Sequence, residues 1–177
     1  MQERIIGTVH RVNGPVIEAG GVTDAIMLEL VRVGEVRLVG EVNKLESGRA
    51  IIQVYEDTTG IAPGDNVYGS GSPLSVELGP GLIGTIYDGI QRPLERILGV
   101  SGSFIQRGVQ LPSLDREKEW EFKPEKLKVG SPVQGGMVIG TVQETERITH
   151  RILLPPDLGQ GTLKSLSAAG QYTVTDP

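Results

Sequence analysis

Glycine and proline are the residues that most constrain what this chain folds into. The sequence holds 25 glycines and 11 prolines among its 177 residues, well above the roughly 12% that the two contribute to average proteins. Residues that interrupt regular structure at this density limit the length of each element. The sequence therefore favours short strands and turns over long helices.

The first 70 or so residues show the alternation of apolar and polar side chains that is typical of strands. We expect strands over residues 5–11, 16–19, 26–33, 36–45 and 49–55. Turn signals separate them, among them the triplet at 13–15 and Ser47-Gly48. Five or six short strands at about 8–12-residue spacing predict a small closed barrel, because closure leaves no exposed strand edge.

Residues 73–110 differ from the segments on either side. Helical spacing over 82–90 predicts one short helix, and Pro93 suits the first position of a second helix over 94–98. From Leu111 the strand pattern returns, with Trp120 and Phe122 on one face of a predicted strand. We therefore predict a mainly β chain: a six-stranded N-terminal barrel over 1–72, a short helical connector over 73–110, and a β-rich domain of barrel-sandwich type over 111–177.

Composition excludes several classes of protein. The absence of cysteine excludes disulfides, thiolate chemistry and cysteine-ligated zinc. A net charge of −5 without a basic cluster argues against nucleic acid as a partner, since phosphate binding depends on concentrated Lys and Arg. Apolar runs fall short of the ~18–20 residues that a membrane span needs, so we expect no direct membrane insertion.

No motif predicts a catalytic, cofactor-binding or metal-binding residue. A phosphate loop ending at Lys164-Ser165 would need glycine at positions 158 and 163, and both are leucine. His10 and His150 each lack a second ligand at zinc-site spacing. The acidic residues at alternate positions of 115–121 are interleaved with Lys and Arg, which is typical of a solvated segment.

The second β segment has the glycine and valine cadence of a biotinyl or lipoyl carrier domain. Such a carrier needs a lysine at its central hairpin as the attachment point. No lysine stands between Gly130 and Lys164. The sequence therefore argues against the carrier function, whereas the same sandwich architecture is retained.

A longer motif gives the sequence a family resemblance. Residues 74–94, Leu-Ser-Val-Glu-Leu-Gly-Pro-Gly-Leu-Ile-Gly-Thr-Ile-Tyr-Asp-Gly-Ile-Gln-Arg-Pro-Leu, closely resemble the catalytic A subunits of the vacuolar/archaeal-type rotary ATPases. The resemblance extends over residues 14–16, 53–60, 104–109, 120–122 and 149–156. Its most specific part is a set of connector or interface positions: Tyr87, Asp88, Gly89, Ile90, Gln91, Arg92 and Pro93.

The resemblance implies a role in assembly. In that family the N-terminal barrel belongs to a crown in which A and B subunits alternate, and the insert after the connector, matching about 111–177, is a bulge that marks the catalytic A type and faces the peripheral stalk. ATP and magnesium bind in a later domain, so the resemblance assigns no catalytic residue to these positions. The parent protein couples ATP hydrolysis or synthesis to proton or sodium transport, in the cytoplasm at the membrane periphery.

Two alternatives stay open on the sequence alone. One is a stand-alone β-barrel interaction module of the same ancestry without ATPase function. The other is the complete enzyme, which differs from the assembly segment only in whether the natural chain continues past Pro177.

Overall fold

The computed structural model describes residues 3–176, which divide into two units. The first unit comprises 3–76 and 97–110, and the second comprises 77–96 and 111–176. Residues 73–110, the predicted connector, are therefore shared between the two. Each unit is described by itself below.

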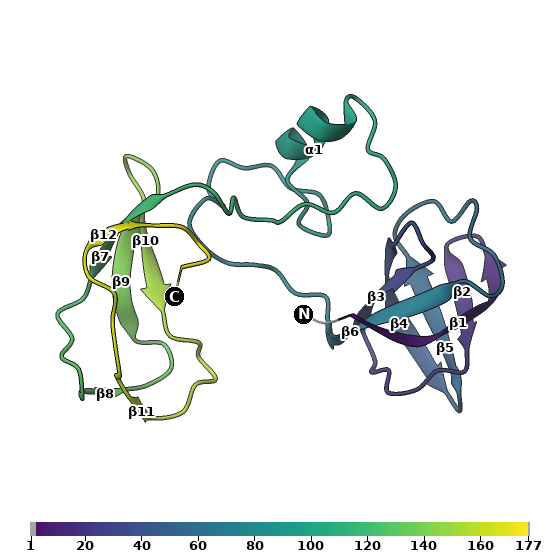
Figure 1. Cartoon of the computed structure of the whole chain (residues 1–177), viewed down its shortest axis with the longest axis horizontal. Coiled ribbons are helices and arrows are strands. Elements are labelled where there is room, and N and C mark those ends of the chain that lie inside the picture. The colour runs from purple at the N-terminus through teal and green to yellow at the C-terminus, as the bar shows by residue number, and fades with distance from the viewer. Residues whose placement is uncertain (1–2, 177) are drawn as a thin grey trace. The chain divides into compact units, whose positions relative to one another are not determined.

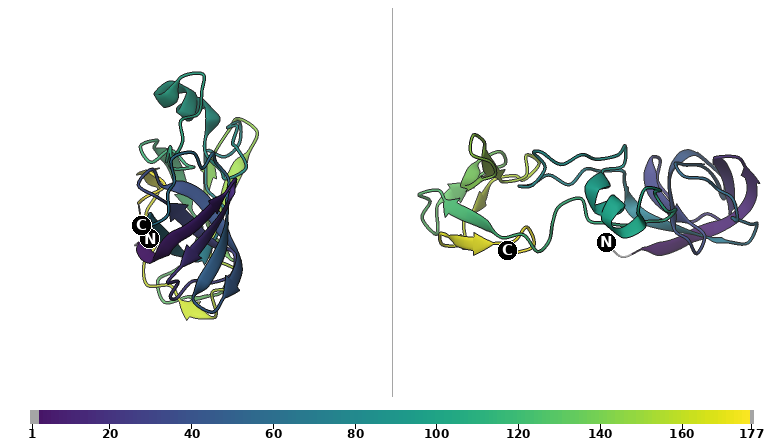
Figure 2. Two further views of the ribbon diagram at one scale, coloured as in Figure 1. Left: turned by 90° about the vertical axis from the view of Figure 1, so that its right-hand side faces the viewer. Right: turned by 90° about the horizontal axis from the view of Figure 1, so that it is seen from above.

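Six antiparallel strands close the first unit into a barrel, in the order β1-β2-β5-β4-β3-β6. Figure 1 labels these strands, and Figure 2 shows them wound around a common centre from two further sides. They are β1 (Arg4–Asn13), β2 (Val16–Gly20), β3 (Glu29–Val33), β4 (Leu38–Glu46), β5 (Arg49–Val54) and β6 (Asn66–Pro73). Register shifts interrupt four of the strand pairings, including β1 with β2 and β4 with β5. Such bulges increase local twist and help a short sheet to close.

The barrel core follows from the alternation in the sequence. Inward positions are β-branched or otherwise apolar, and most are fully buried: Ile6, Val9, Ile17, Ala19, Val31, Val33, Leu38, Val42, Ala50, Ile52, Val54 and Val67. Gly40 lies on this face between Leu38 and Val42, and a Cβ there would lie 2.6 Å from the Gln53 carbonyl oxygen. The strands tolerate only a hydrogen at that crossing.

One strand begins later than the sequence predicts. The predicted strand runs from residue 26 to Val33, but β3 begins at Glu29. Ile26, Met27 and Leu28 form an exposed turn instead. The Glu29 N–H bonds back to the Ile26 carbonyl, and Leu28 takes a left-handed φ of 62°, so strand geometry is lost.

The middle of the chain contains one helix, α1 (Leu94–Ser101), which follows Pro93 as predicted. The other predicted helix, over 82–90, is wrong. Gly84 has a φ of 88° there, and the side chain of Asp88 accepts backbone hydrogen bonds from Ile90 and Arg92. Side-chain acceptors of this kind satisfy the local backbone in a turn rather than in a helix.

The second unit contains a four-stranded antiparallel sheet of order β10-β9-β7-β12 and a two-stranded ribbon, β11-β8 (Figure 1). The strands are β7 (Trp120–Pro124), β8 (Pro132–Val133), β9 (Val138–Gln143), β10 (Thr149–Leu153), β11 (Gly161–Thr162) and β12 (Gly170–Tyr172). Trp120 and Phe122 share the inner face of β7, as predicted. Phe122 meets Tyr172 of β12 edge to face, with ring centroids 6.0 Å apart.

The predicted fold class is confirmed: the chain is mainly β, with a closed six-stranded barrel and a second β-rich unit. Within residues 3–176, no helix is both long and apolar enough to cross a membrane.

Candidate functional site

A buried carboxylate supports the exposed turn of the first unit. Glu29 is fully buried, and its Oε2 accepts the Ile26 N–H at 2.9 Å. Its Oε1 accepts the Gly71 N–H at 2.8 Å. The Arg4 guanidinium lies 4.0 Å from the same oxygen and also donates to the Asp24 carbonyl. Glu29 thus joins the turn to β6, with Arg4 of β1 beside it.

The residues of this turn, Ile26, Met27 and Leu28, are called the apolar tip below. Their exposed fractions are 42%, 49% and 52%. The Leu28 N–H donates to the Val42 carbonyl at 2.9 Å, which attaches the tip to β4. A bulky residue with left-handed φ is strained, and such strain persists only where surrounding contacts impose it. The barrel therefore leaves three apolar side chains partly exposed on a turn that is hydrogen-bonded to it.

Residues 107–108 are attached to the barrel through the loop that follows β5. Glu56 Oε2 accepts the Gly108 N–H at 2.9 Å. Arg107 donates to the carbonyls of Asp57 and Thr59. Gly108 has a φ of 70°, and a Cβ at this position would overlap the Val36 carbonyl oxygen. These contacts explain why 97–110 belongs to the first unit.

The sequence-predicted connector positions form a closed turn in the second unit. Tyr87 and Pro93 pair as an isolated bridge, and the Asp88 N–H donates to the Arg92 carbonyl at 3.1 Å. Asp88 Oδ2 accepts from Arg92 Nε at 2.7 Å. Burial pushes the pKa of Asp88 upward, but hydrogen bonds from Arg92 and Ile90 and the Arg92 charge outweigh it and hold this pKa below its usual value. Asp88 is thus the ionised centre of the turn.

The remaining connector positions also bond inward. Gln91 donates to the Glu77 carbonyl at 2.8 Å and accepts the Glu77 N–H at 2.6 Å, while itself taking a φ of 60°. The Tyr87 hydroxyl donates to the Ser113 carbonyl at 3.1 Å, and Pro93 is fully buried. Of the seven predicted positions only Gly89 is exposed. The motif therefore builds its own turn and presents little side-chain surface.

Glu144 fixes residues 81–83 to the hairpin between β9 and β10. Its side chain is 2% exposed, and Oε1 accepts the N–H groups of Gly81 and Ile83 at 2.7 and 2.9 Å. Oε2 lies 3.3 Å from Nδ1 of His150. Burial raises the pKa of Glu144, but the two backbone bonds and His150 together outweigh burial and lower this pKa below its usual value.

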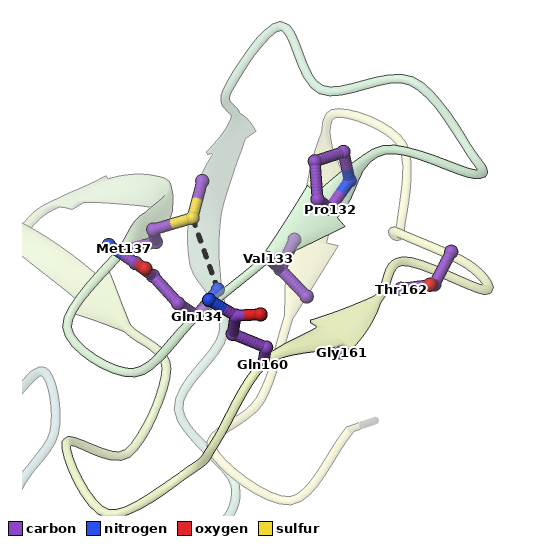
Figure 3. A pocket seen from close by; sticks show the side chains of 7 residues that line it. All are labelled: Pro132, Val133, Gln134, Met137, Gln160, Gly161 and Thr162. Atoms are coloured by element: carbon purple, nitrogen blue, oxygen red, sulfur yellow. Dashed lines mark hydrogen bonds between the residues drawn. The ribbon is translucent and has the colours of Figure 1, made fainter.

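The described residues of the second unit line a larger and a smaller hollow. The larger has a volume of about 980 Å³ and an apolar wall that includes Phe122, Ile139 and Ile152. The smaller, of about 450 Å³, lies between β8 and β11 (Figure 3). Figure 3 shows Gln134 and Gln160 beside it, with the Gln134 N–H donating to the sulfur of Met137 at 3.3 Å. Its lining side chains include no ionisable group, so it offers amide, hydroxyl and thioether groups beside the apolar Pro132 and Val133.

Acidic residues outside these sites cap turns. Asp115 caps a turn by accepting the N–H groups of Glu117 and Lys118. Thr59 bonds to Asp57 in the turn after β5, and Lys164-Ser165 lies in an irregular segment after β11. Over residues 3–176, no three His, Cys, Asp or Glu side chains are grouped so as to hold a metal ion.

Glu29 and Glu144 do not emerge from the motif search, although the alternation contains a signal for both. Position 29 continues the inward series of Val33 and Val31, and position 144 continues that of Gly140 and Val142. A charged residue at an inward position is rarely buried without partners. That rule predicts polar partners for both carboxylates, and the structure shows that these include backbone N–H groups.

Comparison with protein families explains the architecture. Residues 9–71 match the ATP synthase alpha/beta family beta-barrel domain. Residues 111–177 match the ATPsynthase alpha/beta subunit barrel-sandwich domain. The chain belongs to the ATP synthase alpha/beta family. Its barrel is the first of these domains and its second β-rich segment is the other.

Curated relatives agree with this membership. The chain is 57% identical over 172 residues to the A subunit of the A-type ATP synthase of Hyperthermus butylicus, and the match covers 96% of this chain and 28% of the relative. It is 56% identical to that of Metallosphaera sedula, covering 96% and 29%. For Saccharolobus solfataricus the identity is 54%, covering 97% and 29%. The chain thus spans less than a third of the length of these relatives.

Proposed function

We propose that this chain is the N-terminal part of the A subunit of an A-type ATP synthase, which couples ATP synthesis or hydrolysis to proton or sodium transport. The observation that carries the proposal is 57% identity over 96% of the chain to a protein named as the A subunit of such a synthase. The matched region includes both units, so the likeness is not confined to one common β-barrel.

Within that protein, these residues serve assembly. The barrel contacts B subunits in a ring, and residues 111–177 face the peripheral stalk. Two features support this role: an apolar turn that is hydrogen-bonded to the barrel is exposed, and the buried carboxylates Glu29 and Glu144 accept hydrogen bonds from the chain's own backbone. The complex would lie at the cytoplasmic side of the membrane, with these residues outside the bilayer.

ATP and magnesium would bind in the remainder of the parent protein. The sequence of 177 residues contains no G-x-x-x-x-G-K-[S/T] loop, the motif whose backbone N–H groups and lysine hold nucleotide phosphates. The carboxylates that the structure buries, Glu29 and Glu144, are occupied by backbone hydrogen bonds. Neither is available as a base for chemistry on a phosphate.

Immunopurification of the endogenous protein from its own cells tests the proposal. An antibody raised against the 177-residue chain should recover a species several times heavier than 19.0 kDa, together with other ATP synthase subunits identified by mass. A free species of 19.0 kDa without such subunits would contradict the proposal and favour a stand-alone module of the same ancestry.

A further inference from the structure

We propose that Asn13 is a site of spontaneous deamidation, in which the asparagine is converted through a succinimide into aspartate and isoaspartate. Asn13 ends β1 and precedes Gly14, in the turn that joins β1 to β2 (Figure 1). The sequence contains no other Asn-Gly pair. Both residues are exposed. The site goes beyond the proposed function and does not depend on it.

The reaction needs a backbone nitrogen that can attack the carbon of the side-chain amide. The Gly14 nitrogen loses its proton and bonds to Cγ of Asn13, while the amide nitrogen leaves with a proton as ammonia. Water then opens the succinimide ring. Breaking the bond from nitrogen to the side-chain carbonyl gives aspartate, and breaking the bond to the main-chain carbonyl gives isoaspartate. Both products add a negative charge, and isoaspartate adds one atom to the main chain.

The structure leaves the reacting groups open. A Cβ built on Gly14 meets no atom within 4 Å, so solvent base can reach the Gly14 N–H. Over residues 3–176, neither that N–H nor the side chain of Asn13 makes a hydrogen bond. The Gly14 carbonyl, by contrast, accepts from the Thr58 hydroxyl at 2.8 Å. The turn is therefore attached to the barrel without its reactive nitrogen being occupied.

The end of a strand is also the place where Asn13 can rotate toward attack. The extended conformation of a strand does not bring the next nitrogen onto Cγ, so Asn13 must leave that conformation. Its pairing with Val16 is the last in the ladder of β1 with β2, and the ends of elements open most readily. Gly14, with a φ of 57°, gives the turn the rotational freedom that this step requires.

The Asp-Gly pair at 88–89 could form the same succinimide, but its carboxylate is occupied. Asp88 Oδ1 accepts the N–H groups of Ile90 and Arg92 at 3.1 and 2.8 Å. Oδ2 accepts from Arg92 Nε at 2.7 Å. Ring closure would break all three bonds, so the folded chain protects Asp88.

The two other asparagines are less reactive for a different reason. Asn43 lies within β4 and Asn66 begins β6. Lys44 and Val67 follow them, and the side chains of these residues hinder attack by their backbone nitrogens. The structure thus distinguishes Asn13 from every other asparagine of the chain.

Incubation of the 177-residue chain at mildly alkaline pH, followed by peptide mapping, tests the inference. The peptide that contains Asn13 should lose its amide and give aspartyl and isoaspartyl forms, and the isoaspartyl form should be labelled by isoaspartate methyltransferase. Over the same time Asn43 and Asn66 should keep their amides.

Two glycine variants test the part that Gly14 plays. Gly14→Ala should slow the conversion of Asn13 by about tenfold, because alanine lacks the rotational freedom of glycine. Gly48→Ala is the matched control. Gly48 also has a left-handed φ in a hairpin turn of the barrel, with open space around it, so this variant should leave the rate at Asn13 unchanged.

Several results would overturn the inference. If Asn13 keeps its amide as long as Asn43 and Asn66 do, the hairpin holds it away from attack. If Gly14→Ala converts as fast as wild type, Gly14 does not supply the open nitrogen. Asn13→Gln serves if Gly14→Ala fails to fold: glutamine would need a larger ring, so isoaspartate labelling of the folded chain should disappear. Labelling that persists in Asn13→Gln would place the reactive residue elsewhere.

Discussion

At the residue scale, Glu144 gives a prediction about pH. A carboxyl whose pKa is lower in the folded state than in the unfolded chain stabilises the fold above the unfolded pKa, and this contribution is lost as pH falls through the folded pKa. The pKa of Glu144 is lowered, with two backbone N–H groups and His150 outweighing burial. Its stabilisation is therefore complete at neutral pH and disappears in acid, below the usual pKa of a glutamate.

Replacing Glu144 by glutamine should lower the free energy of unfolding at neutral pH by about 1–2 kcal/mol. The amide oxygen can still accept from Gly81 and Ile83, but without the charge that strengthens both bonds. Denaturant titrations at a series of pH values measure the effect. The difference in free energy of unfolding between wild type and variant should become smaller toward acid pH. A difference that does not change with pH would show that the charge of Glu144 does not contribute.

At the element scale, the sequence predicts strands better than helices for a physical reason. Alternation specifies which face of a strand is buried, and this identifies five of the barrel strands and the inner face of β7. Residues 82–90 have helical spacing, yet Gly84 and the side-chain acceptor of Asp88 stabilise turns there. Contacts with residues far away in the sequence, such as that of Glu144 with Gly81, determine the conformation of this segment. The spacing of apolar residues within the segment does not reveal such contacts.

The same limit applies to the candidate sites. The Tyr87–Pro93 motif is identifiable from its residues, but its inward bonding depends on Gln91 reaching Glu77, fourteen positions earlier. The apolar tip resembles part of a strand because its residues are apolar and uninterrupted. The left-handed φ of Leu28 and the bonds of the Glu29 side chain to Ile26 and to the distant Gly71 end the strand before it reaches the tip.

The attachment of 97–110 to the barrel is an element-scale contact that depends on Gly108. Gly108→Ala should detach residues 107–110, because its Cβ would overlap the Val36 carbonyl oxygen. Gly102→Ala is the matched control: Gly102 has a similar φ of 72°, but a Cβ there meets nothing within 4 Å. Both variants carry the strain of a left-handed alanine, about 1–2 kcal/mol.

Hydrogen exchange at the Gly102 and Gly108 positions and in the loop after β5 distinguishes the two variants. Amide protection at residue 108 should be lost in Gly108→Ala and kept in Gly102→Ala. Equal protection of that amide in both variants would mean that the overlap is absorbed by a shift of the 34–37 turn, and that the attachment does not require glycine.

At the scale of the whole molecule, the barrel contains everything needed for its own closure. All six strands lie within residues 4–73, and every member of the buried core cluster lies between Ile6 and Val67. Residues 97–110 add to this unit from outside, through Glu56 and the carbonyls of Asp57 and Thr59. Closure removes both edges of the sheet, so no strand is left to pair with a neighbour.

We therefore expect residues 1–76 to fold without the rest of the chain. Small domains bury only ~60% of the surface that their unfolded chains expose, so the isolated barrel should be marginal in stability. Without the hydrogen bonds of Arg107 and Gly108 its free energy of unfolding should be about 1–3 kcal/mol lower than that of the barrel in the full chain. Protected amides along β1–β6 in hydrogen exchange would confirm closure. A collapsed species with unprotected amides would instead mean that residues 97–110 are required to complete the barrel, because their contacts with the loop after β5 would then hold β5 in register.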